Sequence, residues 1–584
     1  MDYELLIRGG KIIDGSGLPG YVGDVGIRAG KVVEMGRLRG SALRTIDAAG
    51  MVVSPGFVDH HTHLDAQILW DPYGTSEPEN GVTSVVMGNC GLALAPVVEG
   101  VEDSIIKSFV RVEAMPREAL VQGIKWGWRS YGDYLDRLEG KVGINVGGLV
   151  GHIAVRQTVM GEESVEREAT AAEIARMQAH VHEAMEGGAL GLSTNRNSRH
   201  FREDGKPVAS RLATLDELFQ LCDVLGELNC GVAETIVNLS DREQIAWYDA
   251  LARRTGRPVI WQSVLHRYSA PDFWKEQLEA IEPTFRDGYR AYGLSNTEPI
   301  YNRFTLNNAQ VFDEWPTWKN IMFLPELVRK QAFADPETRV KLKAEMAEVR
   351  YTGFHKRWDL IPIIKVGKPE NEHLVGKTIA ELGQMRGQHP IDAMIDFSLE
   401  EGLETTFLSA NGGDPEAMGE IMRSPYVLVG LSDAGAHVQF NAAFAYATKL
   451  LGYWVRERGI MPLEQAIYKL SFQVASVYGL NDRGLLRPGY AADVVVFDPA
   501  TVNAREPEWV QDYPANTKRL TQRADGVHYT IVNGTVICED GKMSGDMPGK
   551  VLRGPAYKGS VAVSAANARV SARGQDARAT VAAA

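Results

Sequence analysis

The stretch Gly56-Phe57-Val58-Asp59-His60-His61-Thr62-His63-Leu64-Asp65 determines how the rest of the chain is interpreted. Residues 52–58 are mostly apolar and predict one buried strand with Pro55-Gly56 set into it, and His61 and His63 follow at its polar end. Side chains two apart in a strand point to the same face. Two imidazoles are therefore offered to one point, as a divalent metal requires. The alternative is a pair of hydrogen-bonded histidines at a strand end, but the apolar lead-in and flanking aspartates favour the metal.

Length and composition describe a globular protein with an ample core. At 584 residues the chain exceeds the usual size of a single core, so one large domain with a smaller satellite is expected. Hydrophobic residues make up 44% and charged residues 23%. The net charge of −13 argues against nucleic acid or an anionic membrane surface as a partner.

The sequence also bears on the compartment. The start Met1-Asp2-Tyr3-Glu4 has no basic, apolar signal peptide, and no run approaches the roughly 20 apolar residues of a membrane span. The four cysteines, Cys90, Cys222, Cys230 and Cys538, are too scattered for a disulfide framework. We therefore expect a cytoplasmic protein. The sequence leaves its oligomeric state open.

The two ends of the chain share one pattern. Short alternating strands with glycine turns occupy residues 1–55 and return in 479–553. We expect these two segments to combine into one small β-sandwich. The final residues, 554–584, are rich in Ala, Ser, Gly and Arg and are expected to be disordered.

The middle of the chain, residues 56–478, alternates apolar strands with helices. This rhythm predicts an α/β fold of the (β/α)8 TIM-like barrel class. Residues 267–360 fit the rhythm poorly, and their aromatic content suggests an insertion over the site. Candidate strands are 83–88, 144–150, 189–193, 231–234, 258–264, 291–294 and 427–431, and candidate helices include 170–186 and 215–228.

Because barrel enzymes carry their chemistry at the carboxyl ends of the strands, polar residues there are candidates for function. Cys90 closes one strand and is either a small core residue or a third metal ligand. Asp433 closes another and is either a turn residue or a metal ligand that also serves as general base.

Further polar residues follow other strands. His152 and His437 are each either structural or functional, and His437 is the better candidate for polarising a substrate oxygen. The cluster Asn195, Arg196 and His200 comes after another strand. Arginine there could hold a substrate carboxylate through paired hydrogen bonds, or could be solvated loop charge.

Several motifs together resemble one known family. They are Pro55-Gly56-Phe57-Val58-Asp59 with His61-Thr62-His63, Gly81–Gly91 ending in Asn89-Cys90-Gly91, Val150-Gly151-His152, Gly191-Leu192-Ser193-Thr194, Ser432-Asp433-Ala434-Gly435, and Gly479–Asp493 near the end. In this order they resemble the metal-dependent amidohydrolase superfamily, in its D-aminoacylase (N-acyl-D-amino-acid deacylase) branch. The resemblance covers nearly the whole chain.

The resemblance implies a (β/α)8 barrel with a small β-sandwich from both chain ends, and hydrolysis of an amide by a zinc-activated water. His61 and His63 match the ligand pair of the first strand, Cys90 the ligand cysteine after the second, and Asp433 the aspartate after the last. The implied substrate is a small N-acyl amino compound, and His152, Asn195, Arg196, His200 and His437 are the candidate substrate-binding residues.

The chain also departs from the branch. Relatives supply further zinc-binding histidines from the fifth and sixth strands, whereas this chain has Glu234 at the first position and no histidine in register at the second, where Gln262 stands and His266 comes late. The lysine that usually helps to bind the substrate carboxylate is missing too. Either one zinc ion binds to His61, His63, Cys90 and Asp433, or Glu234, Gln262 or His266 builds an altered second site. We favour the single zinc ion.

The sequence therefore predicts a zinc-dependent hydrolase of a linear amide, most simply an N-acyl-D-amino acid, with Asp433 transferring the proton. One alternative is an amidohydrolase acting on a cyclic amide, a carbamate or a lactone. An alternative of another class is a non-catalytic binding relative with a degenerate metal site.

Overall fold

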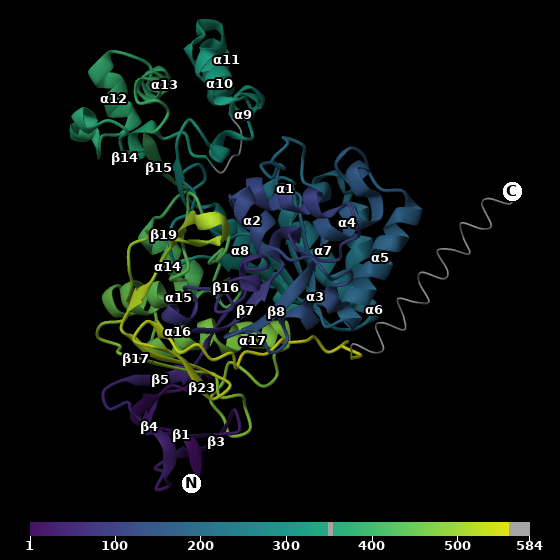
Figure 1. The fold of residues 1–584 in the computed structure, drawn as a ribbon, viewed down its shortest axis with the longest axis vertical. Coiled ribbons are helices and arrows are strands. Elements are labelled where there is room, and N and C mark those ends of the chain that lie inside the picture. The colour runs from purple at the N-terminus through teal and green to yellow at the C-terminus, as the bar shows by residue number, and fades with distance from the viewer. Residues whose placement is uncertain (349–353, 560–584) are drawn as a thin grey trace, which may run out of the picture.

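The computed structural model describes residues 1–348 and 354–559, and at its centre lies an eight-stranded parallel sheet. The strands follow one another in chain order around the sheet, which confirms the TIM-like barrel (Figure 1). The barrel strands are β6 (Phe57–Asp59), β7 (Val82–Met87), β8 (Asn145–Gly151), β9 (Gly191–Asn195), β10 (Val232–Ile236), β11 (Val259–Trp261), β12 (Ala291–Ser295) and β16 (Val427–Val429).

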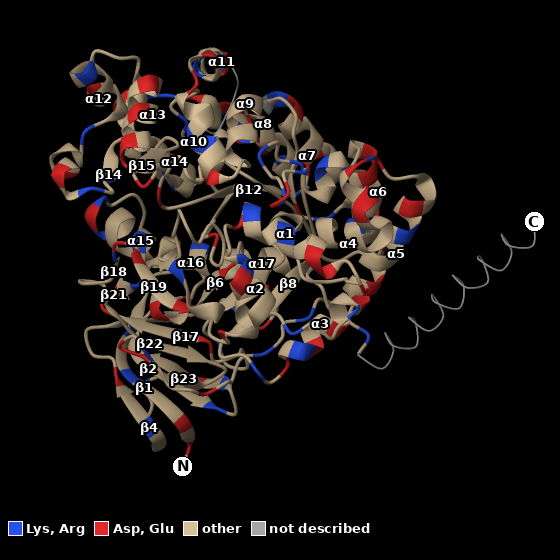
Figure 2. Ribbon diagram, turned by 45° about the horizontal axis from the view of Figure 1, so that its top comes forward, with Lys and Arg blue, Asp and Glu red and all other residues tan. Residues whose placement is uncertain are grey.

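Helices cover the outside of this sheet. Some of them begin at capping boxes; in α5, Thr170 accepts a hydrogen bond from the Glu173 backbone. The helices of this layer are α1 (Glu102–Val112), α2 (Arg117–Gly123), α3 (Tyr131–Leu138), α4 (His152–Met160), α5 (Ala171–Glu186), α6 (Leu215–Glu227), α7 (Asp241–Thr255), α8 (Phe273–Arg286), α14 (Pro415–Arg423), α15 (Tyr446–Lys449), α16 (Leu463–Leu470) and α17 (Phe472–Tyr478). Figure 2 shows Asp and Glu interspersed with Lys and Arg over these helices.

The barrel strands are apolar because both of their faces are covered. Every residue of β7 and of β8 is buried, and β8 carries three glycines where neighbouring groups come close. A Cβ on Gly148, for example, would lie 2.3 Å from the Tyr131 hydroxyl. Strands buried on both faces and rich in apolar residues are typical of parallel sheets, which is why the sequence shows these strands clearly.

The first and last barrel strands meet just beyond their carboxyl ends. Thr62 and Ala434 form a parallel bridge, the His63 amide donates to the Ala434 carbonyl at 2.7 Å, and the Asp433 amide donates to the His61 carbonyl at 3.2 Å. This seam places the segment after β6 directly beside the segment after β16.

A second domain is one mixed sheet of nine strands from both chain ends, as predicted. The strands of the two chain ends meet in the middle of this sheet, where β5 (Val52–Pro55) lies between β1 (Tyr3–Ile12) and β17 (Val494–Phe497). The other strands are β2 (Tyr21–Arg28), β3 (Lys31–Gly36), β4 (Ala42–Asp47), β22 (Val527–Val532), β23 (Thr535–Glu539) and β24 (Lys542–Met543). The single strand expected over 52–58 is wrong: the chain leaves the nine-stranded sheet at Gly56 and enters the barrel as β6.

Part of the second β-rich segment leaves this sheet and packs on the barrel. The hairpin of β19 (Glu508–Tyr513) and β20 (Thr517–Thr521) lies beside α2, and the Tyr513 hydroxyl donates to Gln67 Oε1 at 2.6 Å. Two short strands, β18 (Asn503–Ala504) and β21 (Ala524–Asp525), pair at the base of this excursion.

The insertion differs from the expected range 267–360. Residues 273–295 belong to the barrel as α8 and β12, and the insertion instead occupies residues 296–414, between β12 and α14. It packs around its own hydrophobic core and rises above the barrel in Figure 1. Its elements are β13 (Tyr301–Phe304), α9 (Pro316–Met322), α10 (Glu326–Ala334), α11 (Pro336–Ala347), β14 (Ile363–Lys365), α12 (Ile379–Arg386), α13 (Pro390–Glu400) and β15 (Thr406–Ala410).

The chain after the nine-stranded sheet runs under the barrel at the amino ends of its strands. The Leu552 amide donates to the Val146 carbonyl at 2.7 Å, and the Gly554 amide donates to Gly188 at 3.0 Å. The prediction of a disordered tail from residue 554 is therefore wrong for residues 554–559, which form backbone hydrogen bonds with the barrel. The rest of that predicted tail, 560–584, lies outside the described residues. In the described part of the chain, no helix combines the length and apolarity needed to cross a bilayer.

Candidate metal centre and substrate pocket

Five strand ends converge on one buried cluster of side chains. His61 and His63 follow β6, Cys90 follows β7 in the short turn Asn89–Gly91, and Asp433 follows β16. Glu234 lies on β10, and Gln262 comes directly after β11. All of these positions are at the carboxyl ends of parallel strands, where such barrels carry their functional groups.

Three of these side chains form a compact ligand group. One donor atom each from His61, His63 and Cys90 lies within 4.8 Å of the others, and all three residues are buried. Cys90 Sγ is 3.7 Å from His61 Nε2. Two imidazoles and a thiol suit zinc, whose ligands are typically nitrogen and sulfur. The donor set therefore fits the expected metal.

The turn that carries Cys90 depends on a glycine. Gly88 has φ +76°, and a Cβ there would lie 2.1 Å from the Leu149 carbonyl oxygen. Because only glycine tolerates both the left-handed conformation and this close approach, the chain can turn sharply after β7. The turn directs Cys90 toward the two histidines.

Asp433 lies beside this ligand group. Its Oδ1 is 3.3 Å from His61 Nε2 and 3.8 Å from His63 Nε2. Burial raises the pKa of Asp433, but the hydrogen bond and charge of His61 outweigh burial and bring it to about 2. The carboxylate is therefore ionised at neutral pH. Its place is fixed by the seam between the first and last strands.

Glu234 and Gln262 fill the opposite side of the cluster. Glu234 Oε2 accepts a hydrogen bond from the Cys90 amide at 2.9 Å, and burial raises its pKa to about 6. Gln262 Nε2 lies 2.9 Å from His61 Nε2, 3.1 Å from Cys90 Sγ and 3.3 Å from Glu234 Oε1. The amide thus occupies the space between the three groups.

A further carboxylate, Glu113, was not anticipated from the sequence. It follows α1, is 1% exposed, and places Oε1 3.5 Å from His63 Nδ1. Glu113 Oε2 lies 3.8 Å from His437 Nδ1. Its position in a helical connection after β7, far from any strand end, gave no signal in the sequence.

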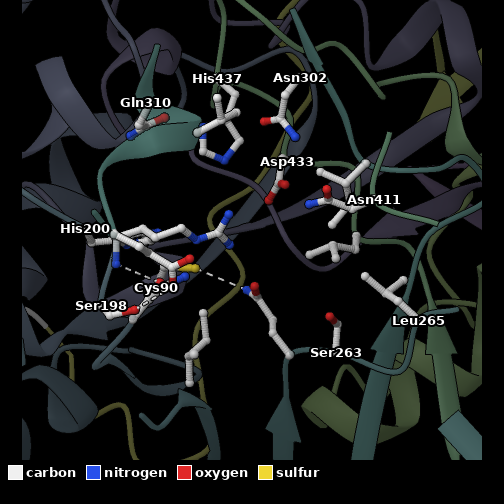
Figure 3. Close-up of a pocket in the computed structure, with 18 of the residues that line it drawn as sticks. Cys90, Ser198, His200, Ser263, Leu265, Asn302, Gln310, Asn411, Asp433 and His437 are labelled. Carbon is white, nitrogen blue, oxygen red and sulfur yellow. Dashed lines mark hydrogen bonds between the residues drawn. The ribbon is translucent and has the colours of Figure 1, made fainter. Parts of the chain in front are cut away.

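The cluster opens into a cavity of about 490 Å³. Loops after β9, β10, β11 and β16 form its walls, and the insertion contributes Asn302, Gln310, His355 and Asn411. Figure 3 shows Cys90 and Asp433 at this cavity, with Asn302 and Asn411 beside Asp433. The insertion therefore completes the site from above, as its aromatic sequence suggested.

Two of the candidate substrate-binding residues line this cavity. His437 stacks on Phe440 with ring centroids 5.0 Å apart, and His200 is held by Asn195 through a 2.6 Å contact between Asn195 Nδ2 and His200 Nδ1. Asn195 itself is buried behind the wall and supports His200. His437 and His200 therefore lie at the cavity, whereas Asn195 lies behind its wall.

Other sequence candidates lie elsewhere. The ring nitrogens of the buried His152 contact Thr194 Oγ1 at 2.8 Å and Glu217 Oε1 at 2.9 Å, because the side chain turns into the helix layer at the start of α4. His266 Nδ1 accepts the Gly413 and Asp414 amides at 3.3 Å, so this ring anchors the insertion. Neither residue lines the cavity, contrary to the expectation.

Arg196 is also outside the cavity, and Arg199 lines it instead. The side chain of Arg199 makes no ion pair or hydrogen bond within residues 1–348 and 354–559. Its charge adds to burial in lowering the pKa of His200 and of His437. Arg199 thus gives the cavity a guanidinium that forms no direct ion pair within the described residues.

Comparison with known proteins agrees with this geometry. The family model described as the amidohydrolase family matches residues 44–320 and 355–538. D-aminoacylase of Alcaligenes xylosoxydans xylosoxydans is 29% identical over 557 residues, covering 94% of this chain and 97% of that protein.

Two solved structures are similar along nearly the whole chain. A D-aminoacylase with a binuclear metal centre, described by one-metal activation and second-metal attenuation, has a TM-score of 0.65 at 27% identity and covers 94% of this chain and all of its own. N-acyl-D-glutamate deacylase from Bordetella bronchiseptica, complexed with zinc and a phosphonate inhibitor, has a TM-score of 0.67 at 25% identity, covering 95% and 100%.

The barrel, the ligand group at its strand ends and the family match lead to one assignment. The chain belongs to the amidohydrolase family. It is a metal-binding hydrolase of the branch that contains the D-aminoacylases.

Proposed function

We propose that this protein is a zinc-dependent deacylase that hydrolyses the amide of N-acyl-D-amino acids. The observation that carries the proposal is the group of His61, His63 and Cys90 with Asp433 beside it, at the floor of a cavity large enough for a small molecule. The D-amino-acid preference is supported by the activities for which the D-aminoacylase and the N-acyl-D-glutamate deacylase are named. Four unpaired, buried cysteines support a reducing, cytoplasmic location.

We propose one zinc ion per chain, held by His61, His63 and Cys90 with Asp433. A zinc ion at such a site acts as a Lewis acid and lowers the pKa of water toward about 7. The single ion is supported by the one group of three donors at these strand ends and by Gln262, an amide where a further histidine ligand was expected, in contact with His61, Cys90 and Glu234. If a second zinc ion binds, Glu234 is the candidate ligand for it.

Asp433 carries the proton in the proposed reaction. Its low pKa keeps it ionised, so it can accept a proton from the attacking water as the water oxygen bonds to the amide carbon. It then returns that proton to the nitrogen as the carbon–nitrogen bond breaks, giving a carboxylic acid and a free amine. His437 lines the same cavity, where its ring can form a hydrogen bond with the substrate.

Arg199 is proposed as the group that binds the substrate carboxylate. Its guanidinium lines the cavity without a carboxylate partner in the described chain, and arginine binds carboxylates through paired hydrogen bonds. It would take over the role of the lysine that relatives supply. The substrate amide then lies between Arg199 and the ligand group.

The decisive experiment is a hydrolysis screen of paired N-acyl-D- and N-acyl-L-amino acids, together with the zinc content of the purified protein. We expect about one zinc per chain and turnover of the D-series. Asp433→Asn should lower kcat by about 10²- to 10⁴-fold, because positioned proton transfer contributes that much.

Other outcomes point to other functions. Protein with no zinc and no hydrolysis would favour the non-catalytic binding relative, and hydrolysis confined to cyclic amides, carbamates or lactones would favour the other amidohydrolase chemistry. About two zinc ions per chain would bring Glu234 into the ligand set. Turnover by Asp433→Asn at the wild-type rate would refute the proton-transfer role.

A further inference from the structure

Glu113 is a buried carboxylate that neither the ligand group nor the proposed proton transfer uses. It is 1% exposed, and no lysine or arginine of the described chain pairs with it. Burial, together with the nearby charges of Asp433 and Asp65, raises the pKa of Glu113. A buried ionisable group without a partner is costly, so such groups are generally paired with another charged or polar group. The groups that face Glu113 therefore indicate why it is there.

Those groups are two imidazoles with different tasks. Glu113 Oε1 lies 3.5 Å from Nδ1 of His63, a proposed zinc ligand, and Oε2 lies 3.8 Å from Nδ1 of His437, which lines the cavity. Within the described residues, His63 Nδ1, His437 Nδ1 and Glu113 Oε2 have no hydrogen-bond partner. The two ring nitrogens thus lie beside the two oxygens of one carboxyl group, at separations somewhat longer than a hydrogen bond.

We propose that Glu113 is a positioning residue that accepts the Nδ1–H of both His63 and His437. This inference rests on the proposed zinc site. With the proton of His63 held on Nδ1, the lone pair of Nε2 points toward the ligand group and Asp433, which lies 3.8 Å from Nε2. For His437, the same carboxylate fixes the ring that faces the substrate.

A carboxylate in this place would act through both histidines at once. Histidine ligands commonly donate their second ring nitrogen to a carboxylate, which fixes the tautomer and raises the basicity of the ligand nitrogen. Removal of such a partner typically costs 10- to 100-fold in metal affinity. The contact between Glu113 and His437 has no effect on metal binding and acts only on turnover.

The first test measures zinc affinity of the zinc-free protein by competition with a chromophoric chelator. Glu113→Ala should bind zinc about 10- to 100-fold more weakly. Glu113→Gln should fall between Glu113→Ala and wild type, because its carbonyl oxygen still accepts the proton but carries no charge. Glu186→Gln is the matched control, since Glu186 also faces a histidine, 3.3 Å from His182 Nδ1, at the other end of the barrel; its zinc affinity should equal wild type.

The second test separates the contact of Glu113 with His63 from its contact with His437 by measuring kcat at saturating zinc. Glu113→Ala should remain slow after zinc affinity has been compensated, and His437→Ala should show the same fall in kcat with unchanged zinc affinity. Wild-type zinc affinity in Glu113→Ala, confirmed as folded by circular dichroism, would overturn the inference; if that variant does not fold, Glu113→Gln decides. Absence of zinc from the wild-type protein would instead overturn the proposed function on which the inference depends.

Discussion

Arg199 shows how one side chain can set substrate preference in this cavity. Its neighbour Asn197 holds the loop by accepting the Arg199 amide at 3.0 Å, so the guanidinium is carried by an ordered turn. Because hydrogen bonds to charged groups contribute about 1.5–3 kcal/mol, Arg199→Leu should raise KM for an N-acyl-D-amino acid by roughly 10- to 100-fold. Steady-state kinetics measure this change.

Two comparisons make that prediction specific. Arg196→Leu, a change of the same kind at a half-buried arginine outside the cavity, should leave KM within about twofold, since this side chain does not line the cavity. A substrate in which the carboxylate of the N-acyl-D-amino acid is replaced by a carboxamide should have nearly the same KM with wild type and with Arg199→Leu. An equal rise in KM for both substrates would contradict a carboxylate-binding role for Arg199.

The residues of the site differ in how well the sequence could reveal them. His61, His63, Cys90 and Asp433 each follow an apolar strand, so their position at the carboxyl edge of the sheet was predictable. Glu113 follows a helix, and Arg199 differs from Arg196 only by its place in a loop. Which of these polar residues reaches the cavity depends on tertiary packing, which no local pattern records.

Among the elements, the insertion has a core separate from that of the barrel. Trp315 and Trp318 are fully buried within it, and the Trp318 ring packs 4.4 Å from Phe312 between centroids. The same unit supplies Asn302 and Asn411 to the cavity. Its stability should therefore affect substrate binding without affecting the zinc ligands, which all lie on barrel segments.

Trp318→Ala tests this separation. Removing a buried tryptophan costs about 3–5 kcal/mol, so hydrogen exchange should accelerate over residues 301–410 and KM should rise. Zinc content should stay at the wild-type level. Trp509→Ala, at a tryptophan that is 53% exposed, is the control and should change neither quantity. Loss of zinc in Trp318→Ala would contradict independent packing of the insertion.

At this scale the sequence predicted regular elements better than boundaries between units. The strand β7 was expected at 83–88 and occurs at Val82–Met87, because its valines and β-branched threonine favour a buried parallel strand. The insertion was placed too early, since the aromatic residues of α8 concealed a helix that continues the barrel rhythm. Composition alone did not distinguish an aromatic-rich helix of the barrel from the aromatic-rich insertion.

In the whole molecule, the segment after β24 connects the nine-stranded sheet to the underside of the barrel. Residues 546–559 make five backbone hydrogen bonds to the barrel, and Leu552 joins the apolar cluster at the amino ends of its strands. At about 1 kcal/mol for each hydrogen bond, the segment contributes several kcal/mol before any apolar burial is counted.

Truncation measures that contribution. A chain ending at Gly545 should melt roughly 4 °C lower than wild type, because about 5 kcal/mol of stabilisation is removed from a chain whose unfolding entropy is about 1.2 kcal/mol per kelvin. A chain ending at Gly559, which keeps the whole segment, should melt with wild type. Equal melting temperatures for both truncations, measured by calorimetry, would show that the segment adds no stability.

The overall architecture was predictable because its signals are repeated. Strands with glycine turns at both chain ends predicted a shared sheet, and the alternation between them predicted the barrel. The segment under the barrel was missed at residues 554–559, because Gly554 and its neighbours resemble a disordered tail in composition, while their backbone hydrogen bonds with Gly188 and Glu186 are long-range.

The position of β5 between β1 and β17 has a consequence for the order of events during translation. Strand β5 is complete at residue 55, but its partner β17 is not made until residue 497. At the usual 5–20 residues per second, the ribosome needs roughly 20 to 90 seconds to bridge that interval. Throughout this time the nascent chain carries an unpaired strand edge, the kind of surface that recruits other strands. The amino-terminal sheet is thus started first and finished nearly last, and the growing chain needs protection from aggregation until its far end emerges.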